Sequence, residues 1–529
     1  MAWLPNMVYA DGIRKQTQIK FGGYDHRIGA EDGSVWDEKN MSSRVYPVME
    51  PRKPRYTMRQ LTTPNGYYVH DGVHYWADGT ELFKDGQKIG NVKNSKKVFA
   101  SLGKYIAIWP DKLVYHTEEE TLEPVESTWT GAAKIQNGTY LDVEAAANTI
   151  KATGVDFADY FRAGDAVTIS GATVHEKNNT TIIIREVDGD ELRFYENSFV
   201  IGENGDSEAA LTIKREAPEM DFLCENENRL WGCKGDTIFS SKLGDPFNWN
   251  CFDGLATDSY AVDVGSEGDF TGAVSYLGYA VFFKPEKIYK VYGSQPSNYQ
   301  VMGSAALGVD IGSGKSLAVA GETLFYLSRA GVMAYTGGLP QSAAEAFGTE
   351  QYQNGVAGSD GIRYWISMED KNGDLSLFCF DTQNGVWTRE DETKALEFGW
   401  DRGVYMLRSD GTVLLLGDAM EIPADATQEG QVGSFVEFGD FTHEDPNRKG
   451  VSKFQLRVEV EQGATLELLV QFDSDGVWKS VKTMQPDKKK SYYLAVVPRR
   501  CDHYRIKLVG TGMWRMYSMT RESYSGSEL

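Results

Sequence analysis

A glycine-rich segment that ends in Gly-Lys-Ser comes nearest to phosphate chemistry in this chain. Residues 311–316 read IGSGKS. A phosphate-binding loop needs a further glycine five residues before Gly314, so that backbone N–H groups can cradle the phosphates, and Val309 stands there. The residues that follow, LAVAGETLFYL, are typical of a strand rather than of the helix that such a site opens. The segment therefore predicts no nucleotide site.

Two further segments have residue types that bind metal ions. His70 and His74 have the spacing of zinc ligands on a helix, but Asp71-Gly72 between them predicts a turn, and no third ligand is near. Residues 473–478, DSDGVW, resemble a calcium loop or the Asp-box of sialidase propellers. The calcium loop's later glutamate is missing, and Asp and Gly in a hairpin turn need no ligand. We predict no metal site.

Catalytic signals are equally sparse. Glycosidase chemistry needs two carboxylates in one cleft, and 76 Asp and Glu residues give no way to choose a pair. No Gly-x-Ser-x-Gly nucleophile turn is present in a strand-to-helix context. The sequence thus predicts no catalytic residue and no cofactor, and we expect a protein that is not an enzyme.

The elements that would position any site are short strands separated by Gly, Asp and Asn. In residues 219–252, three β-prone runs alternate with turn signals, as in a compact antiparallel sheet. Similar units recur at residues 66–84, 97–115, 270–292, 317–335, 356–387 and 395–417. Such units bury their open faces when they stack radially, which predicts an all-β fold with a β-propeller of about six to seven blades. The alternative is a row of β-sandwiches.

The remaining segments differ from the repeated units. We predict an extended N-terminal arm at residues 1–60, a propeller at 61–127 and 216–429, an inserted small β-barrel or sandwich at 128–215, and a C-terminal β-sandwich at 430–529. Lys453 to Val460 alternate apolar and polar side chains, the period of a strand with one solvated face. Residues 144–152 are a short-helix candidate. The arm is locally basic around Arg52 and Arg55, and docking on a neighbouring subunit is one interpretation; a linker packed on the surface is the other.

Composition limits the function classes. With a formal net charge of −22, no basic patch for clamping nucleic acid is evident in the sequence. No apolar run reaches membrane-spanning length, and the first residues lack the pattern of a secretory signal. Five Cys with no Cys-x-x-Cys pair indicate free, buried thiols in a protein made in a reducing cytosol.

Three short motifs within residues 228–249 resemble one family. NRLWG at 228–232, TIFS at 237–240 and GDPFNW at 244–249 are similar to the blade signature of tail hub or nozzle proteins of tailed bacteriophages, also called packaged-DNA stabilisation proteins. NMSS at 40–43 and the inserted FRAGDAVTIS at 161–170 also fit such chains. The resemblance implies a virion protein, made in the host cytoplasm.

In such a particle, copies would form a ring in the tail or neck around the DNA exit channel, in contact with portal, adaptor or tail components. DNA would pass through without sequence-specific binding during ejection. The acidic balance would let the duplex slide, because basic walls would hold it.

Two alternatives remain open. One is a host-surface tail protein that grips glycan through exposed aromatic residues such as Trp478, Trp514 or Tyr517. The other is a carbohydrate-active propeller enzyme.

Overall fold

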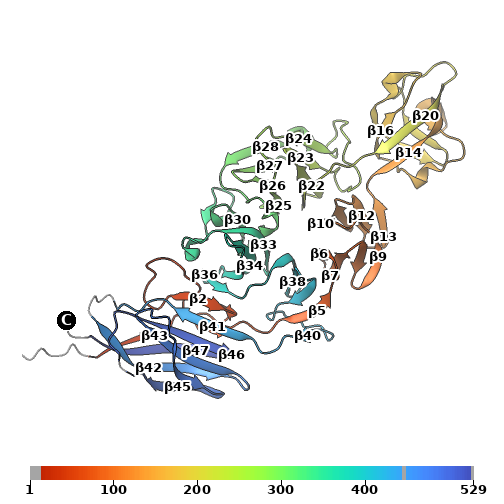
Figure 1. The fold of residues 1–529 in the computed structure, drawn as a ribbon. Coiled ribbons are helices and arrows are strands. Elements are labelled where there is room, and N and C mark those ends of the chain that lie inside the picture. Colours follow the sequence, from red (N-terminus) through yellow and green to blue (C-terminus); the bar gives the residue numbers. More distant parts are fainter. Residues whose placement is uncertain (1–12, 444–447, 498, 526–529) are drawn as a thin grey trace, which may run out of the picture. The chain divides into compact units, whose positions relative to one another are not determined.

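The computed structural model describes residues 13–443, 448–497 and 499–525. Within these residues the chain is all-β, with no α-helix and only short 3-10 turns between strands. It divides into two compact units, Met1–Gly72 with Asp310–Leu529, and Val73–Val309 (Figure 1). Each unit is described by itself.

The unit Val73–Val309 contains successive antiparallel meanders in which neighbours in sequence are neighbours in the sheet. This up-and-down order is that of propeller blades. The strands are β7 (Val73–Asp78), β8 (Glu81–Lys84) and β9 (Gln87–Asn91); β10 (Val98–Leu102), β11 (Tyr105–Trp109), β12 (Leu113–His116) and β13 (Thr121–Pro124); β21 (Phe222–Asn226), β22 (Arg229–Lys234), β23 (Thr237–Ser240) and β24 (Tyr260–Asp263); and β25 (Gly272–Tyr276), β26 (Tyr279–Lys284), β27 (Lys287–Tyr292) and β28 (Gln300–Ala305).

Turn chemistry sets these hairpins. Between β21 and β22, Asn226 pairs with Arg229, so the loop has only two residues. Both of them, Glu227 and Asn228, have positive φ, at 50° and 59°. Two left-handed residues make the turn that matches the natural twist of paired strands, and Asn adopts that conformation readily.

The other unit contains three more meanders of the same kind. Their strands are β29 (Ala318–Ala320), β30 (Thr323–Ser328), β31 (Gly331–Tyr335) and β32 (Gln341–Ser342); β33 (Tyr352–Ser359), β34 (Arg363–Asp370), β35 (Leu375–Asp381) and β36 (Val386–Arg389); and β37 (Ala395–Trp400), β38 (Val404–Arg408) and β39 (Thr412–Leu415), which continue in sheet order with β5 (Tyr56–Gln60) and β40 (Thr427–Gln428). β6 (Pro64–His70) lies against β37. The prediction of an all-β, propeller-type fold is confirmed.

The N-terminal segment differs from the predicted extended arm. β5 closes the β37–β39 blade, with Thr412 opposite Gln60. β1 (Arg14–Gln18) pairs with β47 (Trp514–Ser525), and β2 (Val35–Lys39) pairs with β41 (Gly433–Phe438). β3 (Met41–Ser42) and β4 (Glu50–Pro51) pair with each other and form a separate two-stranded ladder. The segment is therefore built into sheets made by residues far along the chain, while residues 1–12 lie outside the described residues.

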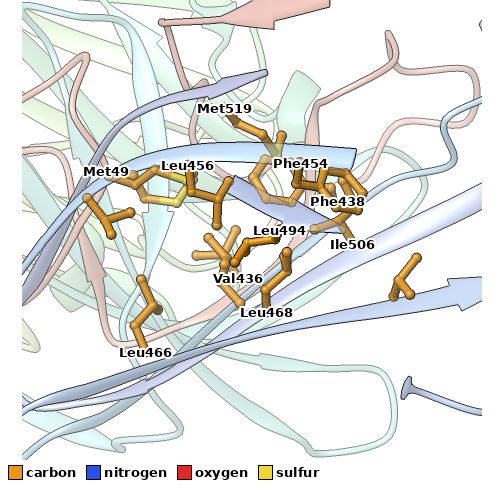
Figure 2. Close-up of a cluster of buried hydrophobic side chains, with 14 of the residues drawn as sticks. Met49, Val436, Phe438, Phe454, Leu456, Leu466, Leu468, Leu494, Ile506 and Met519 are labelled. Carbon is orange, nitrogen blue, oxygen red and sulfur yellow. The ribbon is translucent and has the colours of Figure 1, made fainter. Parts of the chain in front are cut away.

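The C-terminal part is a sandwich of two antiparallel sheets. One sheet has the order β1-β47-β42-β45 and the other β2-β41-β46-β43-β44. The strands not yet given are β42 (Lys449–Val460), β43 (Thr465–Phe472), β44 (Lys479–Met484), β45 (Asp487–Ala495) and β46 (Tyr504–Thr511). Their inward side chains, among them Phe454, Leu456, Leu468 and Ile506, make one buried cluster (Figure 2). The period-two pattern of residues 453–460 is the one that β42 shows.

The segment between β13 and β21 forms one seven-stranded antiparallel sheet, in the order β17-β16-β20-β14-β15-β19-β18. Its strands are β14 (Ser127–Tyr140), β15 (Val143–Lys151), β16 (Ala166–Ser170), β17 (Thr181–Ile183), β18 (Glu186–Asp188), β19 (Glu191–Tyr195) and β20 (Asp206–Arg215). The short-helix prediction for residues 144–152 is wrong, because β15 pairs with both β14 and β19 and this pairing overrides the helix preference of its alanines.

A buried glutamate joins β2 to the end of β36. Glu38 is 2% exposed, and its carboxylate accepts a hydrogen bond of 2.9 Å from the backbone N–H of Arg389. Burial raises the pKa of Glu38 from 4.5 to about 8, although this hydrogen bond opposes the rise. The folded chain therefore binds an extra proton between these two pH values.

The chain should lose stability as pH rises from about 4.5 to 8, by up to about 1.4 kcal/mol per pH unit from Glu38. Glu38→Gln should flatten this part of the pH profile of the free energy of unfolding, measured by denaturant titration. Glu392→Gln, at a carboxylate whose side chain is 48% exposed, is the control and should leave the slope unchanged. Equal slopes for wild type and Glu38→Gln would show that this group does not titrate as described.

Candidate functional site

The glycine-rich segment that drew attention in the sequence is a packed connection. The 3-10 turn Gly314–Ser316 has only three residues. The hydroxyl oxygen of Ser313 accepts from the N–H of Gly355 at 3.0 Å, and that of Ser316 accepts from the N–H of Leu327 at 2.9 Å. Lys315 forms an ion pair with Glu397. The polar side chains of this segment therefore bind neighbouring parts of the chain.

The two segments with metal-ligand residue types have other partners. The Nε2 atom of His70 lies 3.4 Å from the carboxylate of Asp71. Residues 473–478 form the turn after β43, in which Asp475 accepts from the N–H of Val477 at 3.0 Å and pairs with Arg499. Among the described residues there is no group of three or more His, Cys, Asp or Glu that could hold a metal ion.

The aromatic residues proposed for glycan contact differ in accessibility. Trp514 is fully buried, and its indole N–H donates to the hydroxyl of Ser434 at 3.0 Å, so the prediction of an exposed Trp514 is wrong. The hydroxyl of Tyr517 donates to Glu459 at 2.8 Å. Trp478 is half-buried near the ammonium group of Lys507. The alternation of apolar and polar residues along a strand does not show which of its two faces is covered by a second sheet, and for this reason the sequence did not reveal that Trp514 is buried.

The motif residues around 228–249 hold the long connection between β23 and β24. The buried guanidinium of Arg229 donates to the carbonyl oxygens of Ser241 at 2.9 Å and Ala256 at 2.7 Å. The carboxylate of Asp258 accepts from the N–H groups of Gly254 and Leu255 at 2.7 and 2.9 Å. These hydrogen bonds give partners to backbone carbonyl and N–H groups of the connection that would otherwise be buried without one.

The end of the same motif joins this loop to the inserted sheet. The amide oxygen of Asn248 accepts from the N–H of Ala166 at 2.9 Å, and its nitrogen donates to Asp165 at 3.1 Å and Asp245 at 2.7 Å. Asp165 is also ion-paired with the buried Arg215, whose Nε donates to the carbonyl of Val125 at 2.8 Å. We call this cluster the insert joint. It fixes the base of the insert on the two blades that flank it in sequence.

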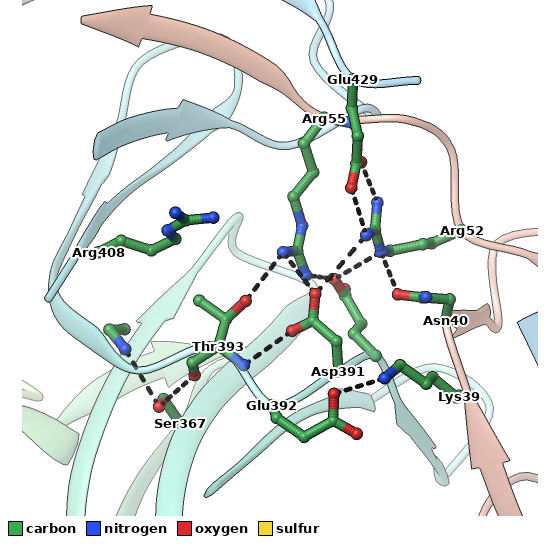
Figure 3. Close-up of polar contacts among 12 residues, drawn as sticks. Lys39, Asn40, Arg52, Arg55, Ser367, Asp391, Glu392, Thr393, Arg408 and Glu429 are labelled. Carbon is green, nitrogen blue, oxygen red and sulfur yellow. Dashed lines mark hydrogen bonds and ion pairs between the residues drawn. The ribbon is translucent and has the colours of Figure 1, made fainter. Parts of the chain in front are cut away.

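A second polar cluster holds the basic N-terminal segment (Figure 3). Arg52 binds both carboxylate oxygens of Glu429, at 2.7 and 3.1 Å, and its Nε donates to Asn40 at 2.8 Å. Arg55 donates to Glu390 at 2.6 Å and to Asp391 at 2.8 Å. Both arginines are nearly fully buried, so their charges are neutralised within the chain.

Two carboxyl groups of this cluster, those of Asp391 and Glu429, have a lowered pKa. Burial would raise the pKa of Asp391, but the charges of Arg55 and Arg52 and the hydrogen bonds from Thr393 and Arg55 together outweigh it and keep the pKa below the ordinary value. The pKa of Glu429 is lowered in the same way, chiefly by its hydrogen bond from Arg52 against the effect of burial. The cluster therefore acts as a set of charge-assisted bonds between β5, the end of β36 and the link to the sandwich.

A cleft of about 600 Å³ lies where the N-terminal segment meets loops of the sandwich. It is lined on one side by Asp25, Arg27, Asp32 and Trp36, and on the other by the loop residues Asp440 and Ser474 and by Arg505 of β46. Its volume falls in the range of small-molecule sites.

The polar groups of the cleft are positioned by ion pairs. Arg27 donates to both oxygens of Asp25 at 2.7 Å, and this bond lowers the pKa of that carboxyl group. Arg505 lies 2.9 Å from Glu437 and 3.4 Å from Asp440, with its guanidinium 6.0 Å from the centre of the Trp36 ring. An indole ring beside carboxyl and guanidinium groups offers apolar ring area together with hydrogen-bond donors and acceptors for a polyhydroxyl ligand.

No family model matches the chain, and no curated protein matches it. Among solved structures, it is similar to the β-propeller domain of the Trilobed protease from Pyrococcus furiosus, at 10% identity over 71% of this chain and 98% of that one, with a TM-score of 0.29. An exo-β-1,3-galactanase from Phanerochaete chrysosporium matches at 11% identity over 55% and 92%, with a TM-score of 0.19. A mutant Trypanosoma rangeli sialidase matches at 10% over 96% of each chain, with a TM-score of 0.21.

This set contradicts the expectation that the chain is not an enzyme, because glycoside hydrolases recur in it. That expectation is withdrawn. At TM-scores below 0.5 the similarity carries no argument for a particular activity in this chain. No helix among the described residues is both long and apolar enough to span a membrane.

Asn248→Ala should loosen the insert joint, because it removes one hydrogen-bond donor from the buried carboxylate of Asp165 and leaves the N–H of Ala166 without its acceptor. The expected cost is about 1–3 kcal/mol, with faster hydrogen exchange at Ala166. Exchange mass spectrometry and denaturant titration measure both effects. Asn250→Ala, two residues along the same loop, should cost less than about 0.5 kcal/mol. Unchanged exchange at residues 164–166 in Asn248→Ala would contradict the role given to this side chain.

Proposed function

We propose that this chain is a structural protein of a tailed bacteriophage, present in the virion as a ring of copies around the DNA exit channel in the tail hub, nozzle or neck. The observation that carries the proposal is the place of the motif residues. Of those that resemble the phage tail family, Asp245 and Asn248 lie in the connection between β23 and β24, and Arg229 of β22 binds the backbone of that connection. In this role the motif residues hold the fold together.

The bracing of the N-terminal segment supports the same proposal. β5 is paired into a blade, β1 and β2 into the sandwich, and the Arg52–Arg55 cluster ties the link between them. A ring that withstands the passage of DNA needs subunits that deform little, and strand pairing with buried charge-assisted bonds provides this.

The distribution of charge fits a channel through which DNA passes. Residues 216–429 hold 32 Asp and Glu against 14 Lys and Arg. Duplex DNA is a dense line of negative charge that basic walls bind tightly, so acidic walls would leave it free to move.

Location in the particle tests this proposal. Antibody raised against the purified chain and coupled to gold should label the tail axis or neck of intact phage particles in electron micrographs, and the chain should appear in gradient-purified particles by mass spectrometry. Particles whose capsid and portal proteins are detected while this chain is absent would refute a virion role. Label confined to peripheral fibres would refute the ring around the exit channel.

The cleft beside Trp36 favours a second candidate, the binding or cleavage of a host-surface carbohydrate. Its carboxylates, guanidinium groups and indole ring are the residue types that recognise sugars by hydrogen bonding and stacking. This candidate is compatible with a tail location, because a tail protein can also contact the host surface.

If the cleft takes carbohydrate, Trp36→Ala should weaken binding of host polysaccharide about tenfold or more, equivalent to about 1.4 kcal/mol. Isothermal titration calorimetry with oligosaccharide fragments measures this, and release of reducing ends reports cleavage. Trp400→Ala, at a tryptophan that is 43% exposed and outside the cleft lining, is the matched control and should bind as the wild type does. No saturable heat from any host glycan would remove the candidate.

A further inference from the structure

A serine, a histidine and an aspartate beside the cleft form a chain of hydrogen bonds. The hydroxyl oxygen of Ser474 lies 2.7 Å from Nε2 of His503. Nδ1 of the same ring lies 3.1 Å from Oδ2 of Asp502. A serine hydroxyl on one ring nitrogen and a carboxylate on the other is the arrangement by which many hydrolases activate a serine. We call these three residues the Ser474 triad.

The carboxylate determines which ring nitrogen carries the proton. An ionised carboxylate can only accept a hydrogen bond, so the bond to Asp502 places the imidazole proton on Nδ1. Nε2 of His503 is then the acceptor for the hydroxyl of Ser474, as a general base requires. The hydrogen bond from His503 also lowers the pKa of Asp502, which keeps this carboxyl group ionised at neutral pH.

Strand pairing brings the three residues together. The ladder between β43 and β46 runs to the end of one strand and the start of the other, and the triad lies just beyond it. The N–H of Asp473 donates to the carbonyl of His503 at 3.0 Å, and the carboxylate of Asp473 accepts from the N–H of Asp502 at 2.7 Å. These bonds join the two segments without the side chain of Ser474, so its bond to His503 is not needed to close the turn.

Ser474 also has an unusual backbone conformation. Its φ is 50°, in the left-handed region that residues other than glycine adopt at a cost in free energy. Residues in such conformations cluster at active sites. Ser474 is exposed and lines the cleft of about 600 Å³, together with Trp36 and Arg505. A ligand that fills the cleft therefore contacts Ser474.

We propose that Ser474 is the nucleophile of an ester hydrolase, with His503 as its general base and Asp502 as the residue that positions His503. The substrate class is a carboxylic ester of a polyhydroxyl compound, such as an O-acetylated sugar. The apolar ring of Trp36 and the charged groups of the cleft suit the polyhydroxyl part. This activity goes beyond the structural role. It shares with the carbohydrate candidate only the use of the cleft as a ligand site.

Hydrolysis has two stages. Oγ of Ser474 bonds to the carbonyl carbon while its proton passes to Nε2 of His503, and the ester C–O bond then breaks as the alcohol leaves with that proton. Water next attacks the acyl-serine, His503 again takes and returns a proton, and the carboxylic acid is released from the restored serine. The guanidinium of Arg505, which lines the same cleft, has the charge that the oxyanion of each tetrahedral intermediate needs.

The exposure of Asp502 favours esters over amides as substrates. Its side chain is 73% exposed, so water screens its charge and it stabilises an imidazolium less than a buried carboxylate would. An amide nitrogen leaves only with strong assistance from a general acid, whereas the oxygen of an ester leaves more readily. The triad therefore suits the less demanding reaction.

Hydrolysis of 4-nitrophenyl acetate and of peracetylated glucose by the full chain tests the proposal. Ser474→Gly removes the hydroxyl and is compatible with a φ of 50°, and it should lower kcat/KM at least about 10³-fold. His503→Ala should do the same, and the double variant should be no slower than either single one, because the two groups act as a unit. Asp502→Asn should lower kcat at least about tenfold and leave KM unchanged. Ser480→Ala, at another exposed serine, is the matched control and should keep full activity.

Covalent labelling gives a readout that does not depend on the natural substrate. A fluorophosphonate should bond to Oγ of Ser474 with loss of fluoride, as peptide mass spectrometry detects, and His503→Ala should abolish the label. Circular dichroism confirms that every variant is folded. Labelling at a different serine, or ester hydrolysis that survives Ser474→Gly, would overturn the proposal.

The remaining outcomes also decide. A wild-type chain that is neither labelled nor active would overturn the proposal. Labelling of Ser474 without hydrolysis of either ester would leave a reactive serine and overturn the hydrolase. None of these results depends on where the chain lies in a phage particle, so the hydrolase and the ring can fail separately.

Discussion

Hydrogen bonds between strands that are far apart in the sequence are the constraint on which the unit that contains them depends. Gln60 and Thr412, which lie 352 positions apart, face each other in the β5–β39 ladder and are also joined through their side chains at 2.9 Å. Without β5, β39 would lie next to no other strand on that side of its blade. The entropic cost of closing a loop grows only with the logarithm of its length. The hydrogen bonds of the β5–β39 ladder therefore outweigh the cost of closing this long loop.

Buried polar clusters fix the positions of the segments that adjoin the paired strands. The Arg52–Arg55 cluster takes charges out of water, and its stability depends on every member having a partner. The insert joint works in the same way, with Asn248 satisfying groups on two segments at once. Hydrophobic burial holds each sheet together, whereas these clusters decide where adjoining segments sit.

Strands with a regular alternation of apolar and polar residues, or with a clear turn signal at one end, could be predicted from the sequence. The period-two alternation of residues 453–460 and the Asn turn at Asn228 gave a fold class that the structure confirms. β1 could not be predicted in this way, because RKQTQ is almost entirely exposed and has no apolar alternation. The helix expectation for residues 144–152 overlooked strands on both sides of β15. The cleft escaped prediction because Trp36 and Arg505 are brought together only by tertiary structure.

The position of β5 also sets the order in which a newly made chain can fold. A ribosome that adds about 5–20 residues per second needs roughly 20–70 s to travel from Gln60 to Thr412, positions 352 residues apart. Through that interval the backbone groups of residues 56–60 lack their final ladder, and those of residues 14–18 wait longer still for β47. The N-terminal strands therefore join last, although they are synthesised first, and the cell must keep them from pairing with other nascent chains.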